Sequence, residues 1–313
     1  MPKLEESRQL QNSTLASVLP ITAIVAARNE ARNLPRCLES LRGVTEIYVI
    51  DSQSTDGTVE IAEAHGAHVV QFHYQGGWPK KRQWAIESLP IANDWIFIVD
   101  ADEALTPELA AEIQTAIQDP AYDGYYVALR MFFLGRELKH SGASFYKLSL
   151  FRRGKGRYEC RLKNQDGSMA DMEVHEHVVL HSGSNGNGSG KARRLRHTLL
   201  HHNVESLSHY IRKHDEYSNW DARVWLEGER STQDLPPSLF GSQAQRRRWL
   251  RKKLFSVPGS PVLLFLYKYL FCLGLLDGVP GLIYCGFQAV QFFNIKAKIY
   301  ELRSQTARQK ELA

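Results

Sequence analysis

Short apolar runs alternate with helical patterns over residues 21–118, and this alternation constrains the fold of the 313-residue chain more than any other feature. Between the runs, apolar residues recur with a helical period, as they do from Leu34 to Leu41. Short apolar strands separated by helices predict a mostly parallel sheet that is covered on both faces. Ligands of such sheets bind at the carboxyl ends of the strands. The expected strands are residues 21–26, 46–50, 67–72 and 95–99.

Three carboxylates follow the run 95–99 directly: Asp100, Asp102 and Glu103. Like charges a few ångströms apart repel, and such a cluster usually persists because a cation neutralises it. The next helix does not need them as caps, because Thr-Pro-Glu at 106–108 supplies an N-cap, a proline at the first helical position and a first-turn acid. We therefore expect Asp100 and Asp102 to hold Mg²⁺ or Mn²⁺ against a diphosphate, while Glu103 supports the turn.

The turns after the first two strands narrow the class of ligand. The first turn, Ala-Ala-Arg-Asn-Glu at 26–30, has no glycine, whereas a dinucleotide fold needs a glycine-rich turn to admit pyrophosphate. This argues against NAD, FAD and P-loop chemistry. After the second strand, Asp51 is placed to accept a hydrogen bond from a base or a ribose, and the following Asp56-Gly57 is explained by turn formation alone.

Three segments together resemble a known family. Residues 24–34, 49–58 and 98–103 are similar, in order, spacing and strand-end context, to family 2 glycosyltransferases with the GT-A fold, a Rossmann-like, mostly parallel sheet with helices on both faces. The resemblance implies an inverting transfer from a nucleotide sugar, usually UDP-linked. The resemblance implies a uridine site at Ala27, Glu30 and Asp51 and a metal on Asp102 with Asp100. It also implies a nucleotide contact at Asp100 and a diphosphate contact at Lys81 or Arg82. For Lys81 and Arg82, an equally good explanation is that they are solvated charges on a helix.

The second half extends the resemblance more loosely. Leu-Phe-Arg-Arg at 150–153, Val-His-Glu at 174–176 and Asp-Gly-Val-Pro-Gly-Leu at 277–282 look like bacterial lipopolysaccharide-core β-glycosyltransferases, which work at the cytoplasmic face of the inner membrane. Strand-like segments here predict a mixed β extension of the sheet. The resemblance implies a lipid-linked saccharide as the acceptor.

Glu176 is the candidate catalytic base. Residues 172–180, taken as a strand of period two, place Glu176 as the only polar group on the apolar face. Burial there would raise its pKa toward the working range of a base, and a positioned base contributes about 10²–10⁴-fold to rate. The alternative is a structural pair with an arginine such as Arg130 or Arg152. Among the histidines, His201 is a candidate for completing the metal shell, as a downstream histidine does in some GT-A enzymes.

The C-terminal part combines a basic segment with two hydrophobic segments. Gln245, Arg248 and Trp249 match Gln-x-x-Arg-Trp, which resembles the acceptor-site motif of processive membrane synthases. The alternative is a basic stretch attracted to anionic lipid, at about 1 kcal/mol per charge. The hydrophobic segments, 261–276 and 280–293, are shorter than the roughly 20 residues of a spanning helix. They predict interfacial or re-entrant helices, with an ordinary helical cap on the catalytic domain as the alternative.

These patterns predict a polar N-terminal extension at 1–18, a GT-A catalytic domain at 19–203 and a helical membrane-association region at 204–313. We expect transfer of a hexose from a UDP-sugar to a lipid-linked saccharide, at the cytoplasmic face of the inner membrane, by a peripheral or monotopic protein. An anionic membrane surface is an expected partner, and nucleic acid is not. The alternatives are transfer to polyprenyl phosphate and a catalytically silent nucleotide-binding scaffold at the membrane.

Overall fold

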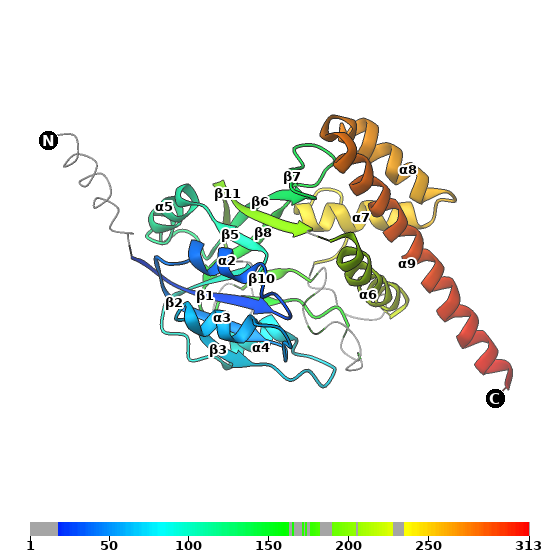
Figure 1. Cartoon of the computed structure of the whole chain (residues 1–313). Helices are drawn as coiled ribbons and strands as arrows, with labels where there is room; N and C mark the ends of the chain where they lie inside the picture. Colours follow the sequence, from blue (N-terminus) through cyan, green and yellow to red (C-terminus); the bar gives the residue numbers. More distant parts are fainter. Residues whose placement is uncertain are drawn as a thin grey trace, which may run out of the picture.

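The computed structural model describes residues 18–162, 165, 171, 173, 176–181, 190–204, 206–227 and 235–312. Within this part of the chain, nine strands form one curved sheet, and the elements after the sheet are helical (Figure 1). The fold is mixed α/β and agrees with the expected GT-A architecture. The division of the chain at 203/204 remains a prediction, although the last strand of the sheet ends at Val204 and the next helix begins at Leu207.

The N-terminal half of the sheet is parallel, as the alternation of strands and helices predicted. Its strands follow the order β3 (His68–Gln71), β2 (Val44–Asp51), β1 (Leu19–Ala27) and β4 (Trp95–Asp100). Helices α2 (Leu34–Ser40), α3 (Thr58–Ala64), α4 (Lys81–Ser88) and α5 (Pro107–Ala116) connect or follow them. In the strand register, Ala27 lies opposite Asp51 and Ala26 lies opposite Asp100. The carboxyl ends of the three inner strands therefore meet at one edge of the sheet.

The second half of the sheet is mixed. Strand β8 (Tyr146–Arg152) runs antiparallel to β4 and to β6 (Gly124–Phe133), and β11 (Ala192–Val204) runs parallel to β6. The short strands are β5 (Glu103–Leu105), β7 (Arg136–Glu137), β9 (Gly156–Tyr158) and β10 (Val178–Leu180), of which β9 and β10 form a separate hairpin.

Two features of this half differ from the sequence interpretation. Strand β11 was not predicted, because most of its residues are basic or polar and its register shifts between Arg194 and Thr198. The strand expected at 172–180 is confined to β10 among the described residues, and residues 172, 174 and 175 lie outside them. Asp171 and Glu173, which the period-two pattern placed on the polar face, are both buried. Among the described residues before β10, side chains at both odd and even positions are therefore buried.

Apolar side chains fill both faces of the parallel half. One cluster joins β1 and β4 to α2 and α5 through Val25, Leu38 and Leu109, and the other joins the opposite faces of these strands to α4. The helix α5 begins as predicted, since the Thr106 hydroxyl accepts a hydrogen bond from the Leu109 N–H at 3.2 Å. Asp100 and Asp102 are accordingly not needed as caps, and their side chains are available for other interactions.

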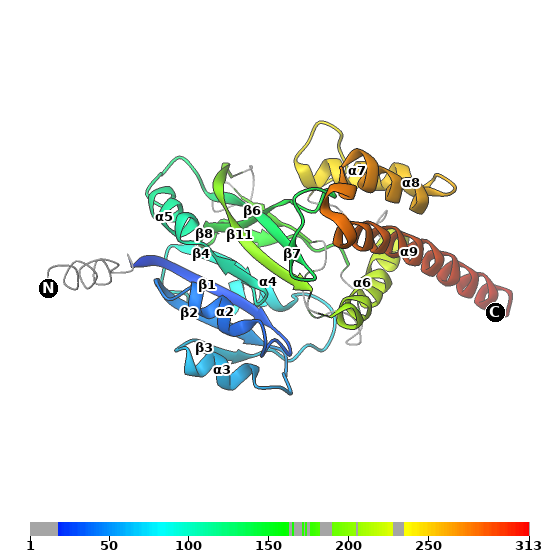
Figure 2. The same ribbon diagram turned by 45° about the horizontal axis from the view of Figure 1, so that its top comes forward.

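The helical part consists of α6 (Leu207–Glu227), α7 (Gln243–Phe255), α8 (Ser260–Leu266) and α9 (Gly278–Leu312). Between α8 and α9 lie a π-helical turn, η1 (Tyr267–Phe271), and a 3₁₀ turn, η2 (Gly274–Asp277). Both ribbon views show α9 running beside α6 and extending away from the sheet (Figures 1 and 2). The second hydrophobic segment, expected at 280–293, is thus only the first part of a much longer helix.

Asp277, which separates the two hydrophobic segments, ties the helical part to the sheet. Its carboxylate accepts hydrogen bonds from the Lys139 N–H at 3.1 Å and from the Ser141 hydroxyl at 2.6 Å, both in the loop between β7 and β8. The turn also requires a glycine at 281, because a Cβ there would lie 2.2 Å from the carbonyl oxygen of Gly274. These contacts fix the bend between α8 and α9 against the catalytic half.

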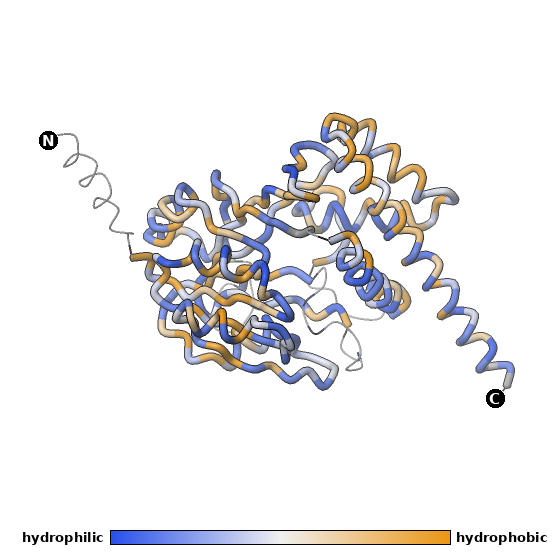
Figure 3. Tube along the Cα trace, in the orientation of Figure 1, coloured by the Kyte–Doolittle hydropathy of each residue, from blue (hydrophilic) through white to orange (hydrophobic). Residues whose placement is uncertain are grey.

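Large apolar side chains are exposed along this bent unit, and Figure 3 shows hydrophobic residues along α8 and the first half of α9. Among the described helices, none alone is long and apolar enough to cross a membrane. Residues 260–271 and 274–309, which are bent by 72°, meet that requirement only as a pair. The most exposed of these side chains are Phe271, Tyr300, Val279, Val262, Leu276 and Phe293.

Candidate functional site

Asp100 lies at the end of β4 in a buried network of charges. Its carboxylate forms ion pairs with Arg82 of α4 and, at 3.0 Å, with Lys147 of β8. Lys147 also contacts Glu103 at 3.2 Å, and Glu103 accepts a hydrogen bond from the Asp100 N–H at 2.9 Å. Burial alone would raise the pKa of Asp100, but the charges of Arg82 and Lys147 hold it well below its usual range. Asp100 is therefore ionised and already neutralised by two protein cations.

Asp102 has a different partner. Its carboxylate lies 3.2 Å from Nε2 of His201 on β11, and the histidine is buried at the same edge of the sheet. Burial would raise the pKa of Asp102, but the neighbouring His201 outweighs it and lowers that pKa. The other ring nitrogen of His201 is buried and has no hydrogen-bond partner among the described atoms. The structure thus brings the candidate metal ligands Asp102 and His201 together across the sheet.

The described residues contain no group of three or more His, Cys, Asp or Glu side chains arranged to hold a metal ion. This does not conflict with the chemistry of Mg²⁺ and Mn²⁺ sites on nucleotides. Such ions are commonly bound by one or two carboxylates together with substrate phosphates. An ionised carboxylate beside a histidine with an unsatisfied ring nitrogen fits a cation whose remaining ligands come from the substrate.

Helix α6 contributes a cation that sequence reasoning missed. Lys213 and Tyr217, one helical turn apart, line the same cavity as Glu30, Asp100 and Asp102. No described residue forms a hydrogen bond or ion pair with the Lys213 ammonium. Its pKa is raised, first by Tyr217 and, against the effect of burial, by Asp102, Glu30 and Asp100. The spacing of Lys213 and Tyr217 on a helical face was the available signal, but without the fold nothing linked it to the strand ends.

Glu30 lines the cavity, whereas the other predicted uridine residues are held in local interactions. Burial, with the charge of Asp102, raises the pKa of Glu30 to about 6. Asp51 is fully buried and accepts hydrogen bonds from the Ser54 N–H at 2.9 Å and from Gln71 at 3.0 Å. The Ala27 carbonyl accepts a hydrogen bond from Lys81 at 2.9 Å. Their roles in nucleotide binding remain predictions.

Lys81 and Arg82 are not solvated helix charges, and that alternative is excluded by their burial. Lys81 is fully buried and forms an ion pair with Asp171 at 3.1 Å, so it faces a protein partner and not the cavity. Arg82 lines the cavity beside Asp100. The N-terminus of α4 is held by Glu173, which accepts hydrogen bonds from the N–H groups of Arg82 and Gln83 at 3.2 and 2.9 Å. A carboxylate at this position is favoured by the helix dipole.

Glu176 is buried, as predicted, and its partner is a lysine. Its carboxylate lies 2.8 Å from Nζ of Lys80, and both side chains are fully buried. The structural alternative named Arg130 or Arg152, but Arg130 pairs with Glu137 and Arg152 stacks over Trp95. Burial raises the pKa of Glu176 to about 7, although Lys80 opposes the shift. A carboxyl group that titrates near neutral pH and lines a cavity has the properties of a general base.

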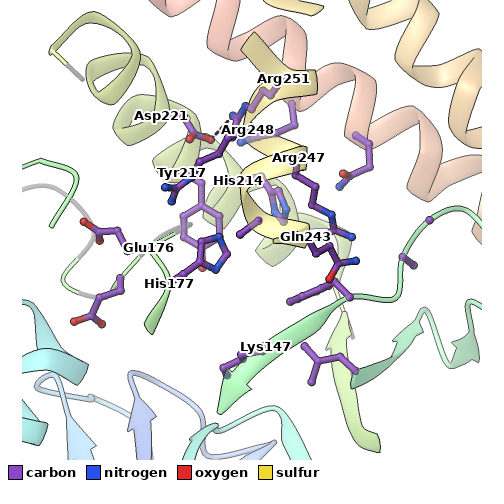
Figure 4. A pocket seen from close by; sticks show the side chains of 18 of the residues that line it. Lys147, Glu176, His177, His214, Tyr217, Asp221, Gln243, Arg247, Arg248 and Arg251 are labelled. Carbon is purple, nitrogen blue, oxygen red and sulfur yellow. Dashed lines mark hydrogen bonds and ion pairs between the residues drawn. The ribbon is translucent and has the colours of Figure 1, made fainter. Parts of the chain in front are cut away.

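A single large cavity of about 1630 Å³ connects these groups with the helical part. Figure 4 shows Lys147 at the strand end, Glu176 and His177 on one side, and Gln243, Arg247 and Arg248 of α7 on the facing wall. Toward α8 and α9 the lining becomes apolar, with Leu264, Phe292 and Ile295. The cavity lining therefore combines carboxylates at the strand ends, a basic wall on α7 and apolar side chains on α8 and α9.

The three residues of the Gln-x-x-Arg-Trp motif do not meet in this cavity. Gln245 closes a capping box at the start of α7, where it accepts a hydrogen bond from the Ser242 N–H at 2.9 Å. Arg248 lines the cavity but pairs with Glu159. The Lys253 ammonium lies 5.8 Å from the centroid of the Trp249 ring. Capping and ion pairing explain Gln245 and Arg248 as parts of the helix packing. An acceptor role for the motif remains a prediction.

Comparisons with known proteins agree with this architecture. The family model described as glycosyl transferase family 2 matches residues 22–177. The chain is 30% identical over 299 residues to the lipopolysaccharide core biosynthesis glycosyltransferase LpsC of Rhizobium meliloti, a match that covers 93% of this chain and 95% of that protein. It is 29% identical over 211 residues to an uncharacterized glycosyltransferase of Rickettsia conorii, covering 65% and 69% of the two chains.

Solved structures are more distant. Glucosyl-3-phosphoglycerate synthase from Mycobacterium tuberculosis, in complex with Mn²⁺, UDP and glucosyl-3-phosphoglycerate, is 21% identical, with 37% of this chain and 44% of that chain covered and a TM-score of 0.28. A likeness of that degree carries no argument about ligands. The full-length match to LpsC and the family model, together with the strand-end carboxylates, confirm the resemblance drawn from the sequence. This chain belongs to glycosyltransferase family 2 and is similar to lipopolysaccharide-core enzymes.

Proposed function

We propose that this glycosyltransferase moves a hexose from a UDP-sugar to a lipid-linked saccharide of the cell envelope, with inversion at the anomeric carbon. One observation carries the proposal: Asp102, His201 and Glu176 line the same cavity, which continues between the helices of the C-terminal part. A donor site and a base at one end of a long cavity leave room for an extended acceptor. The similarity to LpsC supports a glycan acceptor of this kind.

In the proposed mechanism, Asp102 and His201 would hold the divalent cation, and Asp100 keeps Arg82 and Lys147 at the site. When bound, the cation acts as a Lewis acid that neutralises the leaving diphosphate. Lys213 adds a positive charge on the α6 side of the same diphosphate. Because Mg²⁺ prefers oxygen ligands, a histidine in the donor set favours Mn²⁺. This modifies the sequence prediction, in which Asp100 and Asp102 were the metal ligands.

Glu176 accepts the proton of the acceptor hydroxyl in this mechanism. Its raised pKa, about 7, matches the requirement that a base be deprotonated near neutral pH yet retain affinity for a proton. The Lys80 ammonium, 2.8 Å away, orients the carboxylate. Glu30 and Asp51 fix the nucleotide at the strand ends, as the family resemblance implies.

The proposed location is the cytoplasmic face of the inner membrane, with the chain peripheral or monotopic. Two observations support it. The bent unit of α8 and α9 exposes large apolar side chains, including Phe271 at 79% and Val279 at 68%. The neighbouring helix α7 carries Lys252 and Lys253 in its last turn, and such cations are attracted to anionic lipid.

The experiment uses the purified full chain with Mn²⁺ or Mg²⁺ and a panel of nucleotide sugars, and it measures UDP release with and without a membrane lipid extract. We expect one UDP-sugar to give metal-dependent UDP release that the lipid extract stimulates. Absence of UDP release with every donor would overturn the proposal in favour of a catalytically silent protein. Release of pyrophosphate in place of UDP would indicate nucleotidyl transfer.

A second candidate is transfer to polyprenyl phosphate. The ion pair between Glu176 and Lys80 favours it, because a carboxylate bound to a lysine is a weaker base, and a phosphate acceptor is already ionised and needs none. A Glu176→Gln variant separates the two candidates. Activity within a few-fold of wild type would favour the phosphate acceptor.

A further inference from the structure

The basic wall of the cavity contains two kinds of arginine. Arg248 pairs with Glu159, and Arg251 pairs with Asp221 of α6 at 2.7 Å, so the charges of both are balanced inside the protein. Arg247 directly precedes Arg248, and among the described residues its guanidinium donates only to the carbonyl oxygen of Ser144, at 3.3 Å. Figure 4 shows its side chain directed away from Asp221 and toward Gln243. Arg247 therefore presents an unbalanced charge to the cavity.

Lys268 of η1 presents a second such charge. Its ammonium donates to the carbonyl oxygen of Ser141 at 3.3 Å and lies 5.4 Å from the centroid of the Tyr284 ring. Among the residues that the structure describes, no carboxylate lies within ion-pair distance of Lys268 or of Arg247. The carbonyl oxygens that the two cations contact belong to the same loop, three residues apart, and burial, with the positive charge of Arg247, lowers the pKa of Lys268.

Two like charges in one partly buried site are unfavourable unless an anion joins them. Both head groups line the cavity, so an anion can reach them from inside it. Carbonyl oxygens satisfy one donor of each cation, and the remaining N–H groups need acceptors. Arginine with lysine is a donor set that suits a phosphoryl group, because the guanidinium fork binds two oxygens and the ammonium adds a point charge.

The surroundings indicate which molecule carries that phosphoryl group. Aromatic rings lie beside the two cations, since the Arg247 guanidinium is 5.5 Å from the centroid of the Phe145 ring and Lys268 contacts the Tyr284 ring, and both aromatic residues line the cavity. The outer sides of α8 and α9 expose the apolar surface described above. An acceptor with a saccharide, an anionic link and an apolar chain matches a cavity that is lined by carboxylates, by these two cations and by apolar side chains of the C-terminal helices.

We propose that Arg247 and Lys268 form an anion subsite that binds a phosphoryl group at the lipid end of the acceptor. This inference rests on the proposed function, in which the acceptor is lipid-linked. The subsite sets the distance between the lipid anchor and the reacting hydroxyl, and so selects acceptors in which the phosphoryl group and the terminal sugar are correctly spaced.

The test measures binding of decyl phosphate, below its critical micelle concentration, to the full chain by isothermal titration calorimetry. Arg247→Gln and Lys268→Gln should each weaken binding by about tenfold, because a charge-assisted hydrogen bond contributes about that factor or more. The matched control is Arg303→Gln, which removes a positive charge from an exposed position of α9 at a residue that does not line the cavity. Equal losses in all three variants would show a general charge effect and overturn the proposal.

Two further probes identify the source of the phosphoryl group. Inorganic phosphate should bind much more weakly than decyl phosphate, and decyl maltoside should bind equally to wild type and to the two cavity variants. Inorganic phosphate binding as tightly as decyl phosphate would overturn the lipid-linked source. Binding of the probe needs no sugar donor, so wild type that binds decyl phosphate but releases no UDP would contradict the proposed function and leave the anion subsite intact.

Discussion

The two ends of the cavity differ in how their charges are balanced. At the sheet end, Asp100 pairs with Arg82 and Lys147, and Asp102 faces His201, so protein groups balance one another before any ligand arrives. At the helical end, Arg247 and Lys268 donate to carbonyl oxygens, and no carboxylate among the described residues pairs with either of them. A site that is balanced in advance is rigid and preorganised for chemistry. A site with unbalanced charge is completed by its ligand, as acceptor binding requires.

The first prediction concerns the base at the sheet end and carries the largest expected effect. Glu176→Gln should lower the rate of transfer to a hydroxyl acceptor by about 10²–10⁴-fold, because the amide cannot accept the proton. In wild type the base is the ionised form, so the rate should rise with pH and level off above a pKa of about 7. A pH profile of UDP release measures both effects, and the variant should lose the rise.

The matched control for Glu176 is Glu159→Gln. Glu159 is equally buried and pairs with Arg248, but it does not line the cavity. Both substitutions leave a buried cation without its partner and should lower stability by about 3–5 kcal/mol. Only the change at Glu176 should abolish the pH dependence. If Glu159→Gln removes it as well, the pH dependence reflects folding and the role assigned to Glu176 is wrong.

The second prediction concerns the metal. Asp102→Asn should lower transfer by about 10²–10³-fold, a loss similar to removal of one electrostatic stabiliser of a transition state. Mn²⁺-dependent binding of UDP, measured by calorimetry, should weaken in parallel. Asp94→Asn is the control, because Asp94 directly precedes β4, at the opposite end of that strand from the site, and its side chain is 84% exposed. Unchanged metal dependence in Asp102→Asn would remove this residue from the metal site.

The sheet end was largely predictable from the sequence, and the helical end was not. Strand-end positions are local properties, so Glu30, Asp100 and Asp102 could be placed on one edge before the fold was known. His201 could only be guessed, because the basic and polar sequence of β11 does not predict a strand, and its approach to Asp102 spans 99 positions of sequence. Lys213, Arg247 and Lys268 depend on how helices pack against the sheet, which no periodicity encodes.

The third prediction concerns Lys213. Unlike the other charged groups discussed at the sheet end, this cation has no ion-pair partner among the described residues. Its free charge suits the donor diphosphate, so Lys213→Gln should weaken UDP binding by about tenfold, as expected for loss of one charge-assisted hydrogen bond. Lys213→Arg should restore most of the affinity. Arg212→Gln, an exposed neighbour on the same helix, is the control. If Arg212→Gln weakens binding equally, the effect is one of net charge alone.

The fourth prediction, with the smallest expected effect, concerns the apolar surface outside the helical end. Phe271 is 79% exposed, and transfer of a phenylalanine side chain from water to an apolar environment is worth about 1.5–3 kcal/mol when burial is complete. At the interface burial is partial, so Phe271→Ser should lower partitioning onto anionic vesicles by only about fivefold to tenfold. Co-sedimentation with vesicles measures this partitioning.

The control is Phe240→Ser, which removes an even more exposed phenylalanine, at 95%, that precedes α7 and is not part of the α8–α9 unit. The two substitutions are chemically identical, so they can be compared directly. If only Phe271→Ser lowers vesicle partitioning, the lipid contact lies on the bent unit. If both lower it equally, membrane binding does not use this surface in particular.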